Sequence, residues 1–123
     1  MKAKRLILAV DRNPRNLELL AQFLGREGYE VLPAPTLEDF DRSQGRSEEV
    51  GLALLDIAGF DEGIWERCER LRAGGIPFLV LSARQSALVR QESLAHGARS
   101  VLVKPLVVAE LLGVVRGLLG EGT

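Results

Sequence analysis

Four short apolar runs in this chain each end at a polar residue. The runs are Leu6 to Val10 before Asp11, Leu52 to Leu55 before Asp56, Phe78 to Leu81 before Ser82, and Val101 to Val103 before Lys104. Segments with helical spacing of apolar residues lie between them, an alternation that predicts βαβ units and a parallel sheet. Because the carboxyl ends of parallel strands share one edge of a sheet, the four polar side chains are expected in one crevice. Two carboxylates, a hydroxyl and an ammonium suit a site that handles a phosphoryl group.

The composition excludes several classes of protein. The chain has 123 residues, of which 46% are hydrophobic, which is enough for one domain with a proper core. Its net charge of -1 gives no basic footprint for nucleic acid, and no apolar run is long enough to span a membrane. The basic N-terminus leads into an apolar run that stops at Asp11 without a cleavage-like segment, so a cytoplasmic location is the simpler expectation.

Cys68 and His96 are the only residues of their types. One cysteine permits no internal disulfide, and without partners neither residue supports a zinc site. We expect Cys68 to be a small, half-buried hydrophobe in a helix. His96 is expected at a helix end, just before Gly97.

The remaining elements follow from capping and breaking residues. Asn13 and Pro14 are typical of a helix start, and Gly28 is placed to end that helix. The other expected elements are a strand over 29–32, a short helix opened by the capping box at 36–39 and running through 40, a surface loop over 42–49, a strand over 50–55, and helices over 64–72, 86–96 and 107–119. This makes five strands and five helices in strict alternation.

The helix expected over 86–96 has a thin apolar stripe. The stripe consists of Leu88, Val89, Leu94 and Ala95. We therefore expect this helix to be the least firmly packed and the most mobile.

Several motifs, taken in order, carry a resemblance to a known family. They are Asp11 after the first strand, Asp56 ending the third, Ser82-Ala83 ending the fourth, the turn Ala95-His96-Gly97-Ala98, and Lys104-Pro105 after the fifth. With this spacing the chain resembles the receiver domain of two-component response regulators. The resemblance implies one receiver domain over 1–123 with a flavodoxin-like (βα)5 fold, a three-layer sandwich around a five-stranded parallel sheet of order 2-1-3-4-5.

The resemblance also implies a function. A histidine kinase or phosphotransfer protein would pass a phosphoryl group to Asp56, and a downstream protein would read the result. Ser82, Ala83 and Lys104 would bind the phosphoryl group and switch the domain, with Lys104 as a point charge. Such a domain is not an enzyme in the usual sense, because at most it catalyses its own phosphorylation and dephosphorylation.

Mg²⁺ is the cofactor that the resemblance implies. Its expected ligands are Asp11, Asp56 and the backbone carbonyl of Ala58. The family usually has a second acid after the first strand, and here that residue is Arg12. With Lys104 and Arg12 opposing two carboxylates, the formal charge sums to zero, so Mg²⁺ binding is expected to be weak or absent.

Three interpretations of Arg12 remain open. It replaces the metal and clamps phosphoryl oxygens. It pairs with Asp56 and fixes a state that does not depend on phosphorylation, which would make the chain a pseudo-receiver that acts only by binding. Or it points to solvent, and metal still binds weakly.

Other departures from the family pattern agree with an atypical member. The loop over 57–63 lacks the usual proline and is one residue short. Val101 stands where the family often has an aromatic switch residue, so no rotating ring reports phosphorylation here. Leu106 stands where an aromatic residue often follows Lys-Pro.

If the chain is complete, we expect it to signal through contacts that its own surface makes with other proteins. The last helix is a candidate for that surface. Its expected buried face consists of Val107, Leu111, Val114, Val115 and Leu118. Opposite lie Ala109, Gly113 and Gly117, spaced by four. Either a partner or a second copy approaches this stripe closely, in a possible homodimer, or the stripe reflects a glycine-rich composition.

Two enzyme or cofactor-binding alternatives lack key residues. Phosphatases of the haloacid-dehalogenase type need a second Asp two residues after the nucleophile, where this chain has Ala58. A flavodoxin needs a Ser, Thr and Gly-rich phosphate loop after the first strand, where this chain has Arg12-Asn13-Pro14-Arg15. The pseudo-receiver shares every expected element and stays open.

Overall fold

The computed structural model describes residues 4–83 and 85–120, in which five parallel strands form one sheet of order β2-β1-β3-β4-β5. The strands are β1 (Leu6–Val10), β2 (Glu30–Ala34), β3 (Val50–Asp56), β4 (Phe78–Ser82) and β5 (Ser100–Val103). The helices are α1 (Pro14–Arg26), α2 (Leu37–Arg42), the 3-10 turn η1 (Ser43–Arg46), α3 (Gly63–Ala73), α4 (Ala87–Ala95) and α5 (Val108–Leu118). The predicted sheet order is confirmed.

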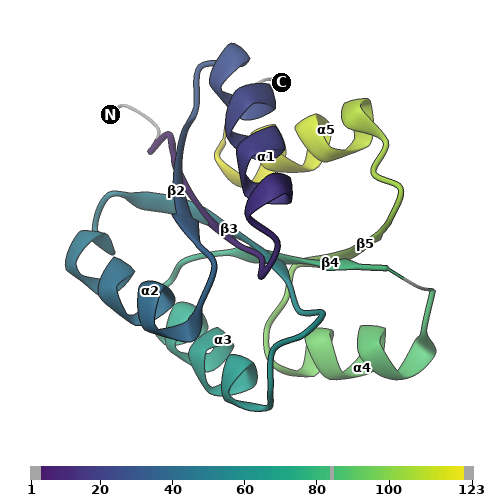
Figure 1. Cartoon of the computed structure of the whole chain (residues 1–123). Helices are drawn as coiled ribbons and strands as arrows, with labels where there is room; N and C mark the ends of the chain where they lie inside the picture. Colours follow the sequence, from purple (N-terminus) through teal and green to yellow (C-terminus); the bar gives the residue numbers. More distant parts are fainter. Residues whose placement is uncertain (1–3, 84, 121–123) are drawn as a thin grey trace.

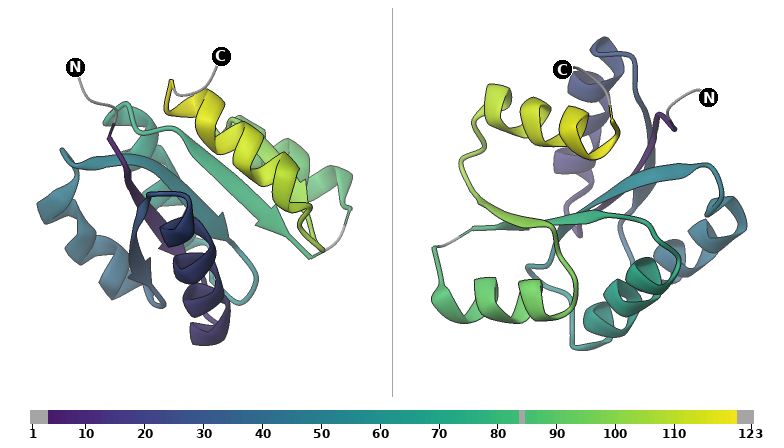
Figure 2. Two further views of the ribbon diagram at one scale, coloured as in Figure 1. Left: turned by 90° about the horizontal axis from the view of Figure 1, so that it is seen from above. Right: turned by 180° about the vertical axis from the view of Figure 1, so that it is seen from behind.

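The sheet lies between two layers of helices (Figure 1). Helices α1 and α5 cover one face, and α2, α3 and α4 cover the other, as both views of Figure 2 show. Every residue of β1 and β4 is buried, which is typical of strands with helices on both faces. This is the predicted flavodoxin-like sandwich. None of the helices in the described residues is long and apolar enough to cross a bilayer.

Strand β2 is longer than predicted. The expected strand ended at Leu32, but pairing with β1 continues through Pro33 to Ala34. Pro33 has no N–H to donate to a neighbouring strand. β2 is an edge strand, and an edge strand tolerates that loss.

The predicted helix starts are confirmed at α1 and α2. The side chain of Asn13 accepts a hydrogen bond of 2.9 Å from the backbone N–H of Arg15, and Pro14 opens α1. Thr36 accepts one of 3.1 Å from the N–H of Asp39, and its hydroxyl donates to that residue's carboxylate. These bonds satisfy N–H groups that have no partner within the helix.

The segment over 42–49 is not the plain surface loop that we expected. Its first half forms η1, and Ser43 is buried with its hydroxyl donating to the carbonyl of Phe40. A local hydrogen bond thus prolongs α2 into a tighter turn. The polar residues and Gly45 in this segment are typical of a loop, so the sequence did not predict the turn.

The expected stripe of α4 is wrong in part. Leu88 is 70% exposed and Leu94 is 40% exposed, whereas the residue that α4 buries is Ser93. Its hydroxyl has no hydrogen-bond partner in the described part of the chain. Helix α4 lies beside β5, a four-residue edge strand, which leaves little apolar surface to cover (Figure 1). The mobility of α4 stays a prediction.

Helix α5 buries two of the five residues of its predicted face and partly buries two more, Val114 and Leu118. Leu111 and Val115 are buried, but Val107 precedes the helix as its N-cap and is 61% exposed. A residue outside the helix does not follow its period, so Val107 leaves the stripe.

Cys68 lies in α3 and His96 lies at the end of α4, as predicted. Cys68 is completely buried rather than half-buried, and this burial raises the pKa of its thiol to about 12. A thiol in that state is inert at neutral pH. His96 caps the end of α4, contacts the carboxylate of Glu69 at 2.9 Å and stacks on Trp65.

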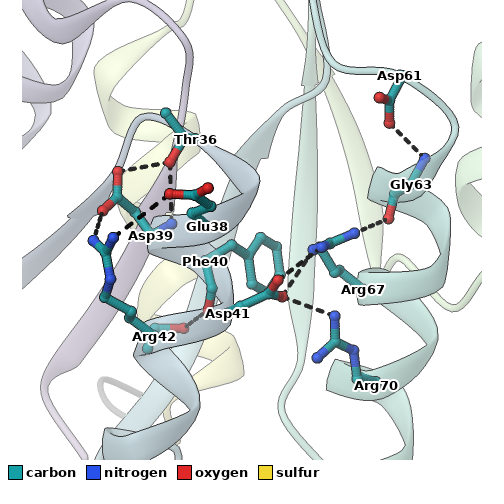
Figure 3. A network of polar contacts seen from close by, with 11 residues as sticks. Thr36, Glu38, Asp39, Phe40, Asp41, Arg42, Asp61, Gly63, Arg67 and Arg70 are labelled. Atoms are coloured by element: carbon teal, nitrogen blue, oxygen red, sulfur yellow. Dashed lines mark hydrogen bonds and ion pairs between the residues drawn. The ribbon is translucent and has the colours of Figure 1, made fainter.

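A polar network joins α2 to α3 (Figure 3). The guanidinium of Arg67 donates to both carboxylate oxygens of Asp41, at 2.9 and 2.7 Å, and Arg70 adds a bond of 2.8 Å. Bonds to the charged carboxylate, those from Arg67 foremost, lower the pKa of Asp41. The pair is bidentate, which is the strongest geometry for such an interaction.

Asp41→Asn tests this network. We expect a loss of at most about 1 kcal/mol in the free energy of unfolding at pH 7, because the pair is partly exposed. The folded pKa lies below the ordinary 3.8, so the contribution of Asp41 is full above about pH 4 and fades as the pH falls through the folded pKa. Urea unfolding of both proteins between pH 3 and 7 measures it. A stability difference that grows toward low pH contradicts the assignment.

Candidate phosphoryl-handling site

The ends of the central strands bring the predicted polar residues to one edge of the sheet. Asp11 follows β1, Asp56 and Ser82 end β3 and β4, and Lys104 follows β5. The parallel register keeps these ends level, since the last residues of neighbouring strands lie opposite one another or one residue apart. Asp11, Asp56 and Ser82 are buried.

Asp56 lies between two donors. One carboxylate oxygen forms an ion pair with the ammonium of Lys104, and the other accepts a hydrogen bond of 3.1 Å from the N–H of Ala58. The backbone N–H of Lys104 donates to the carbonyl of Ser82 at 2.8 Å, which fixes the start of the lysine's loop against β4. Asp56 is 3% exposed, and these contacts hold its carboxylate in one orientation.

Asp11 is held by the start of α1. Its oxygens accept bonds of 2.8 Å from the N–H of Asn13 and 3.1 Å from the side-chain amide of Asn16. Burial, followed by the charge of Asp56, raises the pKa of Asp11 against the effect of these bonds. Asn16 was not among the predicted site residues, although its place as a polar residue in the first turn of the helix after Asp11 was the available signal.

Arg12 reaches across the edge of the sheet. Its guanidinium donates to the carbonyl of Gly59 at 3.1 Å and lies 5.8 Å from the centre of the Phe60 ring. The ion pair that Asp56 makes in the described structure is with Lys104 rather than with Arg12. Arg12 therefore joins the loop after β1 to the loop after β3.

The acidic residues present do not fit a divalent cation well. All four carboxylate oxygens of Asp11 and Asp56 accept bonds from protein donors. Among the described residues no three His, Cys, Asp or Glu side chains are grouped as a metal site. By formal charge, Arg12 and Lys104 offset the two carboxylates, and this reduces the excess negative charge that attracts a divalent cation.

The two positions that depart from the family's aromatic pattern, Val101 and Leu106, each line a cavity. Val101 is buried on β5 and borders a cavity of about 170 Å³ together with Arg90 of α4. Leu106 is half-buried and lines a second cavity.

That second cavity is a groove between α1 and α5. It has a volume of about 420 Å³ and reaches Asp11 and Lys104. Leu19 and Val108 line it and are 49% and 53% exposed. No local sequence pattern predicts this groove, because its walls come from two helices far apart in the chain.

The fold is flavodoxin-like, and comparison with known proteins gives the family. The family model described as the response regulator receiver domain matches residues 7–116. The chain belongs to the family of response regulator receiver domains. Receiver domains are signalling modules of two-component systems rather than classical enzymes.

Two curated relatives show the same kinship. The chain is 34% identical to the transcriptional regulatory protein GltR of Pseudomonas aeruginosa over 94% of its own length and 49% of the relative. It is 35% identical to the uncharacterized transcriptional regulatory protein YrkP of Bacillus subtilis, over 85% of its length and 45% of that protein. The chain thus spans about half the length of these curated relatives.

Solved structures share the fold over nearly the whole chain. The response regulator receiver protein from Burkholderia phymatum has a TM-score of 0.86 at 24% identity, with 98% of each chain covered. The CheY-like receiver domain protein from Methanospirillum hungatei has a TM-score of 0.78 at 29% identity, with 94% of each chain covered.

Asp11→Asn tests the electrostatics of the crevice. Removing one of two neighbouring buried carboxylates relieves desolvation and repulsion, so we expect the melting temperature at pH 7 to rise by a few degrees. Asp11→Ala is the control, because it removes the charge but leaves the N–H of Asn13 without its acceptor and should give less stabilisation or a net loss. If Asp11→Asn melts lower than the wild type while remaining folded, Asp11 is stabilised by its surroundings and this description is wrong.

Proposed function

We propose that this receiver domain accepts a phosphoryl group on Asp56 from a histidine kinase or phosphotransfer protein and signals by protein contact. The observation that supports this most is the ion pair between the buried Asp56 and Lys104 at the carboxyl edge of the sheet. A carboxylate in a polar cradle is a competent nucleophile, and a fixed cation beside it offsets the charge of an incoming phosphoryl group.

In the proposed step, an oxygen of Asp56 forms a bond to phosphorus. The bond between phosphorus and the donor's histidine nitrogen breaks, and the electron pair stays on that nitrogen. Lys104 moves its charge from the carboxylate toward the phosphoryl oxygens. The N–H of Ala58, which already points at Asp56, is a second donor for the developing charge.

Ser82 and Ala83 have the switching role in this proposal. Ser82 ends β4 one residue from the position opposite Asp56, so its hydroxyl can turn toward a phosphoryl oxygen and draw its loop inward. Val101 carries no ring, so the switch relies on backbone movement in place of an aromatic rotation.

A phosphoryl donor has to bring its phosphorus into contact with Asp56, and its surface must therefore cover the mouth of the crevice. The groove between α1 and α5 borders that mouth, and Leu19 and Val108 expose apolar surface there. Exposed apolar surface of this kind is typical of a protein contact. We propose that the kinase or phosphotransfer protein covers this side.

Acetyl phosphate tests the chemistry without a kinase. We expect intact mass spectrometry to show the addition of one phosphoryl group, with acetate leaving, and we expect Asp56→Asn to show none. Lys104→Ala should slow the addition by about tenfold or more, because it removes the charge beside the nucleophile. Each reaction is run with Mg²⁺ and with EDTA.

The pseudo-receiver is the competing outcome. If wild-type protein gains no mass with or without Mg²⁺ and Arg12→Asp gains it with Mg²⁺, Arg12 disables the site and the chain acts only by binding. Phosphorylation of Asp56→Asn at the wild-type level also contradicts the proposal, because the phosphoryl group then lies elsewhere.

We also propose that α5 forms an interface with a second copy of the chain. Ala109, Gly113 and Gly117 are exposed, and a methyl group added at either glycine would meet open space. Without a partner, Gly113→Ala should therefore stabilise the helix by up to about 1 kcal/mol. In a homodimer with close backbones, Gly113→Ala plus Gly117→Ala should weaken self-association. Analytical ultracentrifugation decides: an unchanged monomer for both proteins excludes the homodimer.

A further inference from the structure

Two loops border the crevice on the side of Asp11. One follows β1 and contains Arg12, and the other follows β3 and contains Gly59 and Phe60. The guanidinium of Arg12 bridges them, with 3.1 Å from its nitrogen to the carbonyl oxygen of Gly59. The aliphatic part of Arg12 also packs close, because a methyl group added at Gly59 would lie 3.3 Å from it.

The loop after β3 is a tight turn tied to Asp56. The N–H of Phe60 donates to the carbonyl of Ile57 at 3.2 Å, and Gly59 has a φ of +82°. These are the features of a type II turn, which requires a residue that tolerates positive φ at this place. Next to it, the N–H of Ala58 donates to the carboxylate of Asp56. Fastening this turn therefore also orients the carboxylate.

In the family, Mg²⁺ is the cation expected to join these same two loops through the acids after β1, the acid ending β3 and a loop carbonyl. Here the second acid is an arginine, and the carboxylate oxygens that remain are already bonded to protein donors. The guanidinium bonds to the carbonyl of Gly59, the residue after Ala58, whose own carbonyl is the expected metal ligand.

We propose that Arg12 is a built-in cation that takes over the loop-joining role of the metal. It is a positioning residue: it holds the turn at Gly59 and thereby Asp56, and its charge opposes the entry of a divalent cation. Arginine suits this role because its guanidinium donates to a carbonyl while its charge lies over an aromatic ring, here that of Phe60. The inference rests on the proposed function only in that it concerns the same crevice.

The test measures loop order and metal binding, without phosphorylation. The amides of Ala58 and Phe60 report on the loop, because each donates a bond within it. Their hydrogen exchange is followed by NMR in wild type, Arg12→Gln, Arg12→Lys and Arg12→Asp, first in EDTA and then during Mg²⁺ titration. The amide of Leu8 in β1 serves as the internal control for global unfolding.

In EDTA, the amides of Ala58 and Phe60 should exchange about fivefold faster in Arg12→Gln and Arg12→Asp than in wild type, because the loop loses the net stability of one hydrogen bond. The exchange rate of the Leu8 amide should not change. Mg²⁺ should restore protection in Arg12→Asp and leave wild type unaffected. Calorimetry should give Arg12→Asp at least about tenfold tighter Mg²⁺ binding than wild type. Arg12→Lys should keep the poor metal affinity because it keeps the charge, while losing part of the loop order.

Two results overturn the inference. One is unchanged exchange at Ala58 and Phe60 in Arg12→Gln, which shows that Arg12 holds nothing. The other is Mg²⁺ binding to wild type as tightly as to Arg12→Asp.

If the Arg12 variants do not fold, Gly59→Ala disturbs the same turn through its φ without changing the charge. This variant should speed exchange of the reporter amides and still bind Mg²⁺ poorly. Tight Mg²⁺ binding by Gly59→Ala then also contradicts the inference. None of these outcomes depends on whether Asp56 is phosphorylated.

Discussion

The ion pair between Asp56 and Lys104 is the contact on which the site depends. These residues are 48 positions apart, and β4 lies between their strands in the sheet. The pair forms because β3, β4 and β5 run parallel and end level at one edge. A buried carboxylate without such a partner would cost several kcal/mol of stability, so the sheet order and the site geometry stabilise each other.

The formal charge balance of the crevice distinguishes this receiver domain from the usual pattern of the family. The formal charges of Asp11 and Asp56 are offset by those of Lys104, which pairs with Asp56, and of Arg12, which bonds to the loop after β3. A crevice with excess negative charge attracts a divalent cation from solution, whereas here the positive charge is part of the chain. Arg12 donates its hydrogen bond to the carbonyl of Gly59 rather than to Asp56, and the ion pair of Asp56 is with Lys104. Arginine at position 12 is therefore compatible with Asp56 as the nucleophile of the proposed function.

The sequence predicted the sheet, its order and the converging strand ends, because apolar runs and caps such as Asn13 are local signals. It failed where tertiary surroundings decide. Pro33 continues β2 only because that strand is at the edge, and α4 buries Ser93 rather than its leucines because little sheet surface lies beneath it. The bond from Arg12 to Gly59 joins residues 47 positions apart through a flexible side chain, and no spacing rule predicts it.

A crystal structure of the protein grown with millimolar Mg²⁺ tests the account most directly. We expect the ammonium of Lys104 within about 4 Å of the Asp56 carboxylate. The guanidinium of Arg12 should lie on the carbonyl of Gly59, with no ion between Asp11 and Asp56. An octahedral Mg²⁺ bound by both carboxylates, with Arg12 displaced from Gly59, would contradict the central claim, as would an Asp56 out of reach of Lys104.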